Sequence, residues 1–131
     1  MHEASLVSGM LGMALEEVEK FNASRGPGEG KVVRIKEIAL DIGLISCVEE
    51  QTLKDCFEIM SEGSLAEHAV LTVNRQPLQC QCEDCAKPFE LHRRHFRCPF
   101  CGGEHITFSG GHGCILSKLD VDIEENTNGS A

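Results

Sequence analysis

Hydrophobic positions in the first third of the chain change period once. In residues 4–21 they recur at intervals of three and four, which is typical of one face of a helix. From Lys31 to Gly43 the pattern alternates and is rich in β-branched residues, so it predicts a strand. One slip in this alternation indicates a bulge near Lys36 and Glu37. The predicted inward residues of the helix are Leu6, Met10, Met13, Ala14, Val18 and Phe21.

The following residues predict a second helix and two more strands. Ser46 and Glu49 have the spacing of a capping box in which Ser46 caps the helix, and Gly63 is placed to end it. Residues 69–73 and 115–123 alternate between apolar and polar side chains, as half-buried strands do. The predicted inward residues are Leu53, Cys56, Phe57 and Met60 in the helix, and Ile115, Leu119, Val121 and Ile123 in the last strand.

This order of elements predicts an α+β fold. Two helices would cover one face of a three-stranded mixed sheet, with the strands on either side of the second helix running parallel. We expect a domain of residues 1–77, completed by a strand over residues 113–124. A cysteine-rich domain of residues 78–112 would be inserted between two adjacent strands, and residues 125–131 would form a disordered tail.

Charge and hydropathy exclude several classes of partner. The formal net charge is −9, which argues against nucleic acid because phosphate binding needs clustered Lys and Arg. No apolar run reaches the roughly 18 residues of a membrane-spanning helix. The beginning of the sequence lacks the basic-then-apolar layout of a secretion signal, so the sequence predicts a cytoplasmic protein without a membrane partner.

Eight cysteines in such a chain require an explanation, because disulfides are rare in the cytoplasm. Four of them form two CxxC pairs separated by 12 residues, a pattern that predicts a tetrahedral metal site: Cys82, Cys85, Cys98 and Cys101. Four thiolates would fill the coordination of a structural zinc ion, although iron also accepts this geometry. Cys80 is an extra thiol beside the quartet, and Cys47 is predicted to be a buried thiol or a soft ligand.

The first three residues carry donors for a second metal. The Met1 amine, the amide nitrogen and Nδ1 of His2, and the Glu3 amide could surround one ion in a plane. Planar nitrogen ligands favour Ni(II) or Cu(II) over zinc. The alternative is that His2 and Glu3 are solvated, with Glu3 in the favourable field at the helix N-terminus. The residue types alone leave both interpretations open.

Taken together, the motifs resemble the HypA/HybF family of nickel chaperones for [NiFe]-hydrogenase maturation. The matching segments are MHE, DIGLISCVEEQTLKDCFE, CEDC…CPFCGG and GG…LSKLDVDIE. The resemblance implies that His2 binds nickel with support from Met1 and Glu3, and that Glu49 is an acidic residue linked to nickel binding. It also implies that the cysteine quartet binds zinc in a zinc-ribbon-like domain.

The function implied by the resemblance is nickel delivery by a metallochaperone, not catalysis by an enzyme. The implied partners are the HypB GTPase and the large subunit of [NiFe]-hydrogenase, with urease maturation in some relatives. The protein would be a monomer or a dimer. Two other interpretations of the cysteine module remain at this point: a zinc-ribbon adaptor for protein interaction, and a rubredoxin-like iron–sulfur electron carrier.

Overall fold

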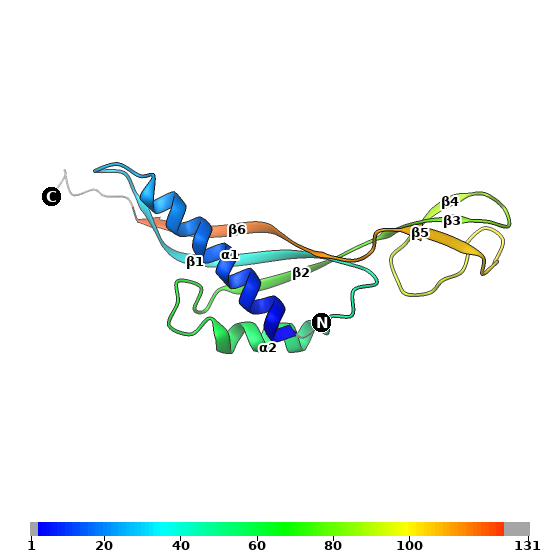
Figure 1. The fold of residues 1–131 in the computed structure, drawn as a ribbon, viewed down its shortest axis with the longest axis horizontal. Coiled ribbons are helices and arrows are strands. Elements are labelled where there is room, and N and C mark those ends of the chain that lie inside the picture. The colour runs from blue at the N-terminus through cyan, green and yellow to red at the C-terminus, as the bar shows by residue number, and fades with distance from the viewer. Residues whose placement is uncertain (1–2, 125–131) are drawn as a thin grey trace. The chain divides into compact units, whose positions relative to one another are not determined.

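The computed structural model describes residues 3–124, in which there are two helices and six strands (Figure 1). In chain order these are α1 (Glu3–Ala23), β1 (Lys31–Gly43), α2 (Glu50–Met60), β2 (Val70–Gln76), β3 (Leu78–Cys82), β4 (Pro88–Leu91), β5 (Ile106–Ser109) and β6 (Cys114–Glu124). Met1, His2 and the predicted tail over residues 125–131 lie outside the described residues. No helix in the described range is long and apolar enough to cross a membrane.

The chain divides into two compact units. The helical unit contains the described residues 3–39, 48–72 and 116–124, and the cysteine unit contains residues 40–47 and 73–115. The strands β1, β2 and β6 pass from one unit into the other. The domain limits predicted from the sequence, 1–77 with 113–124 and 78–112, remain a prediction.

The first sheet has the strand order β2-β1-β6. β1 and β2 run in one direction and β6 in the other, so the sheet is mixed, and the predicted α+β class is confirmed (Figure 1). One expectation about the connections is wrong, because the cysteine-rich insertion joins the two edge strands and not two adjacent strands. The strand with the most buried residues, β1, takes the central position, where both faces can be covered.

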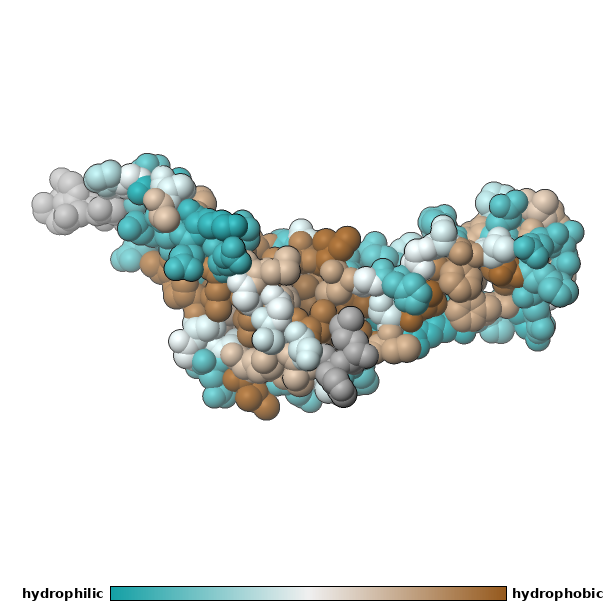
Figure 2. Space-filling model, in the orientation of Figure 1, coloured by the Kyte–Doolittle hydropathy of each residue, from teal (hydrophilic) through white to brown (hydrophobic). Residues whose placement is uncertain are grey.

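Helix α1 buries a stripe that lies to one side of the predicted one. Its buried residues are Val7, Met10, Leu11, Ala14 and Val18. Met13 was expected to be inward but is 57% exposed, because it lies roughly 120° around the axis from the centre of this stripe. Hydrophilic residues cover the C-terminal half of the helix in the space-filling view, where Lys20 pairs with Glu16 and Glu17 (Figure 2).

The capping residue of α2 is Glu49, so the predicted capping box is wrong. Glu49 has an extended backbone, and its carboxylate accepts hydrogen bonds from the backbone N–H groups of Gln51 and Thr52. The Ser46 hydroxyl instead donates to the Gly113 carbonyl, at 3.4 Å. The helix therefore starts three residues later than a Ser46 cap requires. In α2, Leu53 and Phe57 are buried, whereas the expected inward residue Met60 is exposed.

Strand β6 begins at Cys114, one residue after the predicted start, and its pattern of burial differs from the predicted one. Ile115 is 67% exposed and Ile123 is also exposed, whereas both were expected to face inward. As an edge strand, β6 is held to β1 in part by charged side chains across the pair, including Lys118 with Glu37 and Asp122 with Arg34. Both ion pairs and the burial of apolar side chains therefore stabilise this edge of the sheet.

The cysteine unit contains a second sheet with the order β4-β3-β5, in which both pairings are antiparallel. Alternate residues of the central strand β3 point into its core, which consists of Leu44, Leu78, Cys80, Cys82, Phe89 and Cys98. Two of these six residues are predicted metal ligands. The unit therefore has little apolar surface with which to stabilise its fold, and part of its metal site lies within this core.

Candidate metal sites

The structure brings the four predicted zinc ligands together. The sulfur atoms of Cys82, Cys85, Cys98 and Cys101 all lie within 4.8 Å of one another. The Sγ atoms of Cys82 and Cys101 are 3.5 Å apart, and those of Cys85 and Cys98 are 3.6 Å apart. Cys82 and Cys98 are buried, whereas Cys101 is exposed. Four thiols converge on one point from two turns, as a tetrahedral ion requires.

Both CxxC turns use the same backbone geometry. The Ala86 N–H donates to the Cys82 carbonyl and the Gly102 N–H donates to the Cys98 carbonyl, each at 2.9 Å. N–H groups are also directed at the sulfurs, with Phe100 N 3.4 Å from Cys98 Sγ. Each turn thus positions two thiols and offers donors that stabilise their negative charge.

The electrostatics of the cluster favour a bound cation. Burial raises the pKa of the Cys98 thiol, but hydrogen bonds from the N–H groups of Cys101 and Phe100 and from the thiols of Cys85 and Cys101 together bring it down to about 7. The Gly103 N–H favours the Cys101 thiolate, but the neighbouring sulfur atoms and burial together outweigh it and raise the pKa of Cys101 to about 12. Four thiolates this close repel one another without a positive ion between them. The donor set therefore fits a zinc site, in which all four ligands are deprotonated.

Ala86, in the first CxxC turn, has a left-handed backbone conformation that is strained for a residue with a side chain. Ala86 has φ 63°, and the equivalent residue of the second turn is Gly102, with φ 75°. A left-handed conformation costs a residue with Cβ roughly 1 kcal/mol relative to glycine. We expect Ala86→Gly to stabilise the zinc-loaded protein by about 0.5 kcal/mol, and Gly102→Ala to destabilise it by about 1 kcal/mol. Urea unfolding followed by circular dichroism measures both, and shifts of the same sign would contradict this interpretation.

Cys80 and His105, which lie close to the quartet in sequence, each have a partner outside it. Cys80 is buried beside the site, but its thiol is directed at the Leu78 carbonyl, and burial raises its pKa. Cys47, predicted to be a buried thiol or a soft ligand, is exposed. Nδ1 of His105 lies 3.2 Å from a carboxylate oxygen of Asp84, within the first turn. Among the described residues, the group of side chains close enough to share one ion consists of the four predicted cysteines.

The second candidate site lies where the two helices begin. Glu3 is the first residue of α1, and its carboxylate accepts a hydrogen bond of 3.1 Å from the backbone N–H of Glu49, the cap of α2 (Figure 1). This bond lowers the pKa of Glu3, and hydrogen bonds from Thr52 lower the pKa of Glu49. Both carboxylates are therefore charged at neutral pH. The other predicted nickel ligands, Met1 and His2, lie outside the described residues.

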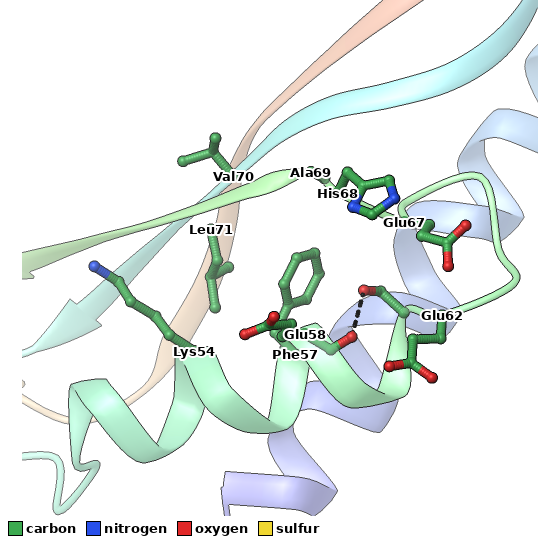
Figure 3. Close-up of a pocket in the computed structure, with 10 residues that line it drawn as sticks. Lys54, Phe57, Glu58, Glu62, Glu67, His68, Ala69, Val70 and Leu71 are labelled. Carbon is green, nitrogen blue, oxygen red and sulfur yellow. Dashed lines mark hydrogen bonds between the residues drawn. The ribbon is translucent and has the colours of Figure 1, made fainter.

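A hollow of about 470 Å³ lies between α2 and β2 in the helical unit. Figure 3 shows Phe57 and Leu71 directed into it, with the carboxylates of Glu62 and Glu67 at its rim. The sequence analysis did not anticipate this hollow, because it forms only when the helix packs beside the strand. None of the predicted metal ligands lines it.

An α+β unit joined to a four-thiol cluster on two CxxC turns defines a metal-binding protein with a zinc-ribbon-like site. The family model for "Hydrogenase/urease nickel incorporation, metallochaperone, hypA" matches residues 1–121. The chain therefore belongs to the HypA family of metallochaperones, and the resemblance found in the sequence is confirmed.

Individual relatives match along nearly their whole length. The hydrogenase maturation factor HypA of Rhodobacter capsulatus is 37% identical over 121 residues, which cover 92% of this chain and 99% of the relative. The hydrogenase maturation factor HybF of Escherichia coli K12 is 30% identical over 122 residues, covering 93% and 100%. The chain thus belongs among hydrogenase maturation factors.

Solved structures support the fold. The solution structure of the Ni metallochaperone HypA from Helicobacter pylori superposes with a TM-score of 0.59 at 23% identity. The match covers 92% of this chain and 97% of that protein. At this level of identity the likeness shows the shared fold.

Proposed function

We propose that this protein binds Ni(II) at its N-terminus and delivers it during maturation of [NiFe]-hydrogenase. The nickel ligands would be the Met1 amine, the amide and imidazole nitrogens of His2 and the amide of Glu3. Four nitrogens in a plane suit Ni(II), and they leave the tetrahedral thiol cluster to zinc. The zinc ion, bound by Cys82, Cys85, Cys98 and Cys101, would be structural because four protein ligands leave no open position.

The observation that carries this proposal is the hydrogen bond between Glu3 and Glu49. It joins the residue that follows His2 in the sequence to the acidic residue that the resemblance linked to nickel. Both oxygens of the Glu49 carboxylate are occupied by the cap of α2. We therefore place Glu49 outside the nickel plane, where its negative charge stabilises the bound cation without becoming a ligand.

Delivery requires a site that opens. A chelate made by the first three residues is dismantled when the end of α1 frays, which costs little compared with unfolding the protein. The proposed recipients and helpers are the hydrogenase large subunit and the HypB GTPase, in the cytoplasm. The net charge of −9 suits docking to basic surfaces on such partners.

Nickel titration tests the proposal. We expect His2→Ala and a chain with one residue added before Met1 each to bind Ni(II) about 100-fold more weakly. The first removes the imidazole, and the second converts the amine into an amide and breaks its chelate ring. Isothermal titration of zinc-loaded protein measures the affinity.

A matched control comes from His68, an exposed histidine beside the hollow at α2. His68→Ala should keep the native affinity, because this residue contributes nothing to the N-terminal chelate. Equal affinity in the native, His2→Ala and extended chains would overturn the N-terminal site.

A further inference from the structure

One arginine of the cysteine unit holds the segment that leads to Glu49. The Arg94 guanidinium donates from Nε to the Leu44 carbonyl at 3.0 Å, and from Nη2 to the Ser46 carbonyl at 2.6 Å. Two donors of one planar fork thus bind two carbonyls of the same segment. A lysine cannot reproduce this arrangement, because its ammonium is a point charge without a fork.

The position of Arg94 depends on the metal site. Arg94 lies in residues 92–97, which have no helix or strand of their own. The segment is fixed at one end by β4, whose Leu91 pairs with Leu78, and at the other by Cys98, four residues after Arg94. When Cys98 binds a metal, this end of the segment is fixed. Without metal, Cys98 no longer fixes this end, and within the described fold the ion pair of Arg97 with Glu104 and the ring contact of Phe96 with Phe108 are left to hold it.

The segment that Arg94 binds is also packed against the metal site. Leu44 is buried in the core that contains Cys82 and Cys98. The Ile45 N–H is hydrogen-bonded to the Gly111 carbonyl at 2.9 Å. Only Cys47 and Val48 separate Ser46 from Glu49, which caps α2 and donates to Glu3. A short stretch of chain therefore connects Ser46, which Arg94 binds, to Glu49, which lies beside the proposed nickel site.

We infer that Arg94 is a positioning residue that makes the order of the Glu49 cap, and through it nickel affinity, depend on metal binding by the cysteine quartet. The nickel part of this inference rests on the proposed function; the coupling to Glu49 does not. A second arginine, Arg75, provides a control for the role of Arg94. Arg75 donates to the same Ser46 carbonyl at 3.1 Å, but it comes from β2, outside the segment that Cys98 anchors.

Residue-resolved amide exchange tests the coupling without nickel. In the native chain, removal of zinc with a chelator should speed exchange of the Glu49, Gln51 and Thr52 amides by about tenfold. In Arg94→Lys these amides should exchange fast with zinc bound, and zinc removal should change them less than about twofold. Arg75→Lys should loosen the same segment yet keep the zinc dependence, because its anchor does not involve the metal.

Further controls separate coupling from loss of fold. Arg93→Lys should behave as the native chain, because the Arg93 guanidinium makes no hydrogen bond or ion pair within residues 3–124. Arg94→Lys and a second variant, Arg94→Gln, should each keep one zinc per chain and protected β3 amides. The inference is overturned if zinc removal leaves native exchange unchanged, or if both Arg94 variants keep the tenfold response.

Nickel titration of the zinc-loaded variants completes the test. Arg94→Lys should weaken Ni(II) binding by about tenfold, and Arg93→Lys should not. Unchanged nickel affinity in Arg94→Lys would overturn the link to nickel, provided that His2→Ala weakens binding. If His2→Ala also binds as the native chain does, the N-terminal site fails, while the exchange experiment still decides the coupling of Arg94 to Glu49.

Discussion

Removal of zinc from the cysteine quartet is expected to unfold β3, β4 and β5. Metal binding contributes roughly 10–16 kcal/mol in comparable zinc peptides, which is as large as the whole stability of a typical domain. Here the core around the site is small, and two of its six residues are themselves proposed ligands, Cys82 and Cys98. Without a cation the four sulfurs also repel one another when they are deprotonated.

The measurement is amide exchange or two-dimensional NMR of the protein before and after chelation. Amides of β3 should lose protection, while those at the centre of α1 should keep it, because α1 packs in the separate core of the helical unit. Cys98→Ser should reproduce the effect of chelation. Protected β3 amides in the metal-free chain would show that packing alone holds this sheet.

Cys80→Ala provides the matched control. Cys80 is buried in the same strand as Cys82, but its thiol is directed at the Leu78 carbonyl and not at the cluster. This variant should keep one zinc per chain, and loss of zinc would place Cys80 among the ligands.

The identity of the metal can be checked on the native protein. Elemental analysis should find zinc and not iron, and the protein should lack the visible absorption of an iron–thiolate site.

Gly43→Ala is expected to destabilise the cysteine unit by more than about 3 kcal/mol. A Cβ atom at this position would lie 2.1 Å from the Gly111 carbonyl oxygen and 2.3 Å from its carbon. These are backbone atoms, so no side-chain rotation can relieve the contact. Gly43 and Ile45 also donate to the Gly113 and Gly111 carbonyls, and the displaced backbone would lose these bonds.

Urea unfolding followed by circular dichroism is suitable, because the chain contains no Trp and no Tyr for fluorescence. The control is Gly110→Ala, whose Cβ would meet no atom within 4 Å but whose φ is +76°. It should cost only about 1 kcal/mol, the strain of a left-handed residue with a side chain. Equal effects of the two substitutions would contradict the proposed close approach of the two backbones.

Local patterns in the sequence were sufficient for several features. The limits of β1 and the position of β6 follow from the alternation of apolar and polar residues, and α1 follows from its helical period. The four cysteines could be selected from eight by spacing alone, because two residues between thiols is the reach of one tight turn. Such features depend on residues that are close together along the chain.

Other features required contacts between distant segments. Glu49 caps α2 in place of Ser46, because the Ser46 hydroxyl bonds to Gly113, 67 residues away. The inserted strands join opposite edges of the first sheet, because β1 takes the buried centre. The bonds from Arg94 to Leu44 and Ser46 have no signature in the local sequence.

The sequence by itself thus determined the two helices, the three strands of the first sheet and which thiols share a turn, because turn geometry and side-chain periodicity act over a few residues; the strands β3, β4 and β5 were not predicted. Only the tertiary structure decided which strand is central, which residue begins α2 and which arginine reaches the segment before Glu49. These choices depend on competition among distant hydrogen-bond donors, acceptors and apolar surfaces, and that competition is resolved only when the chain is folded.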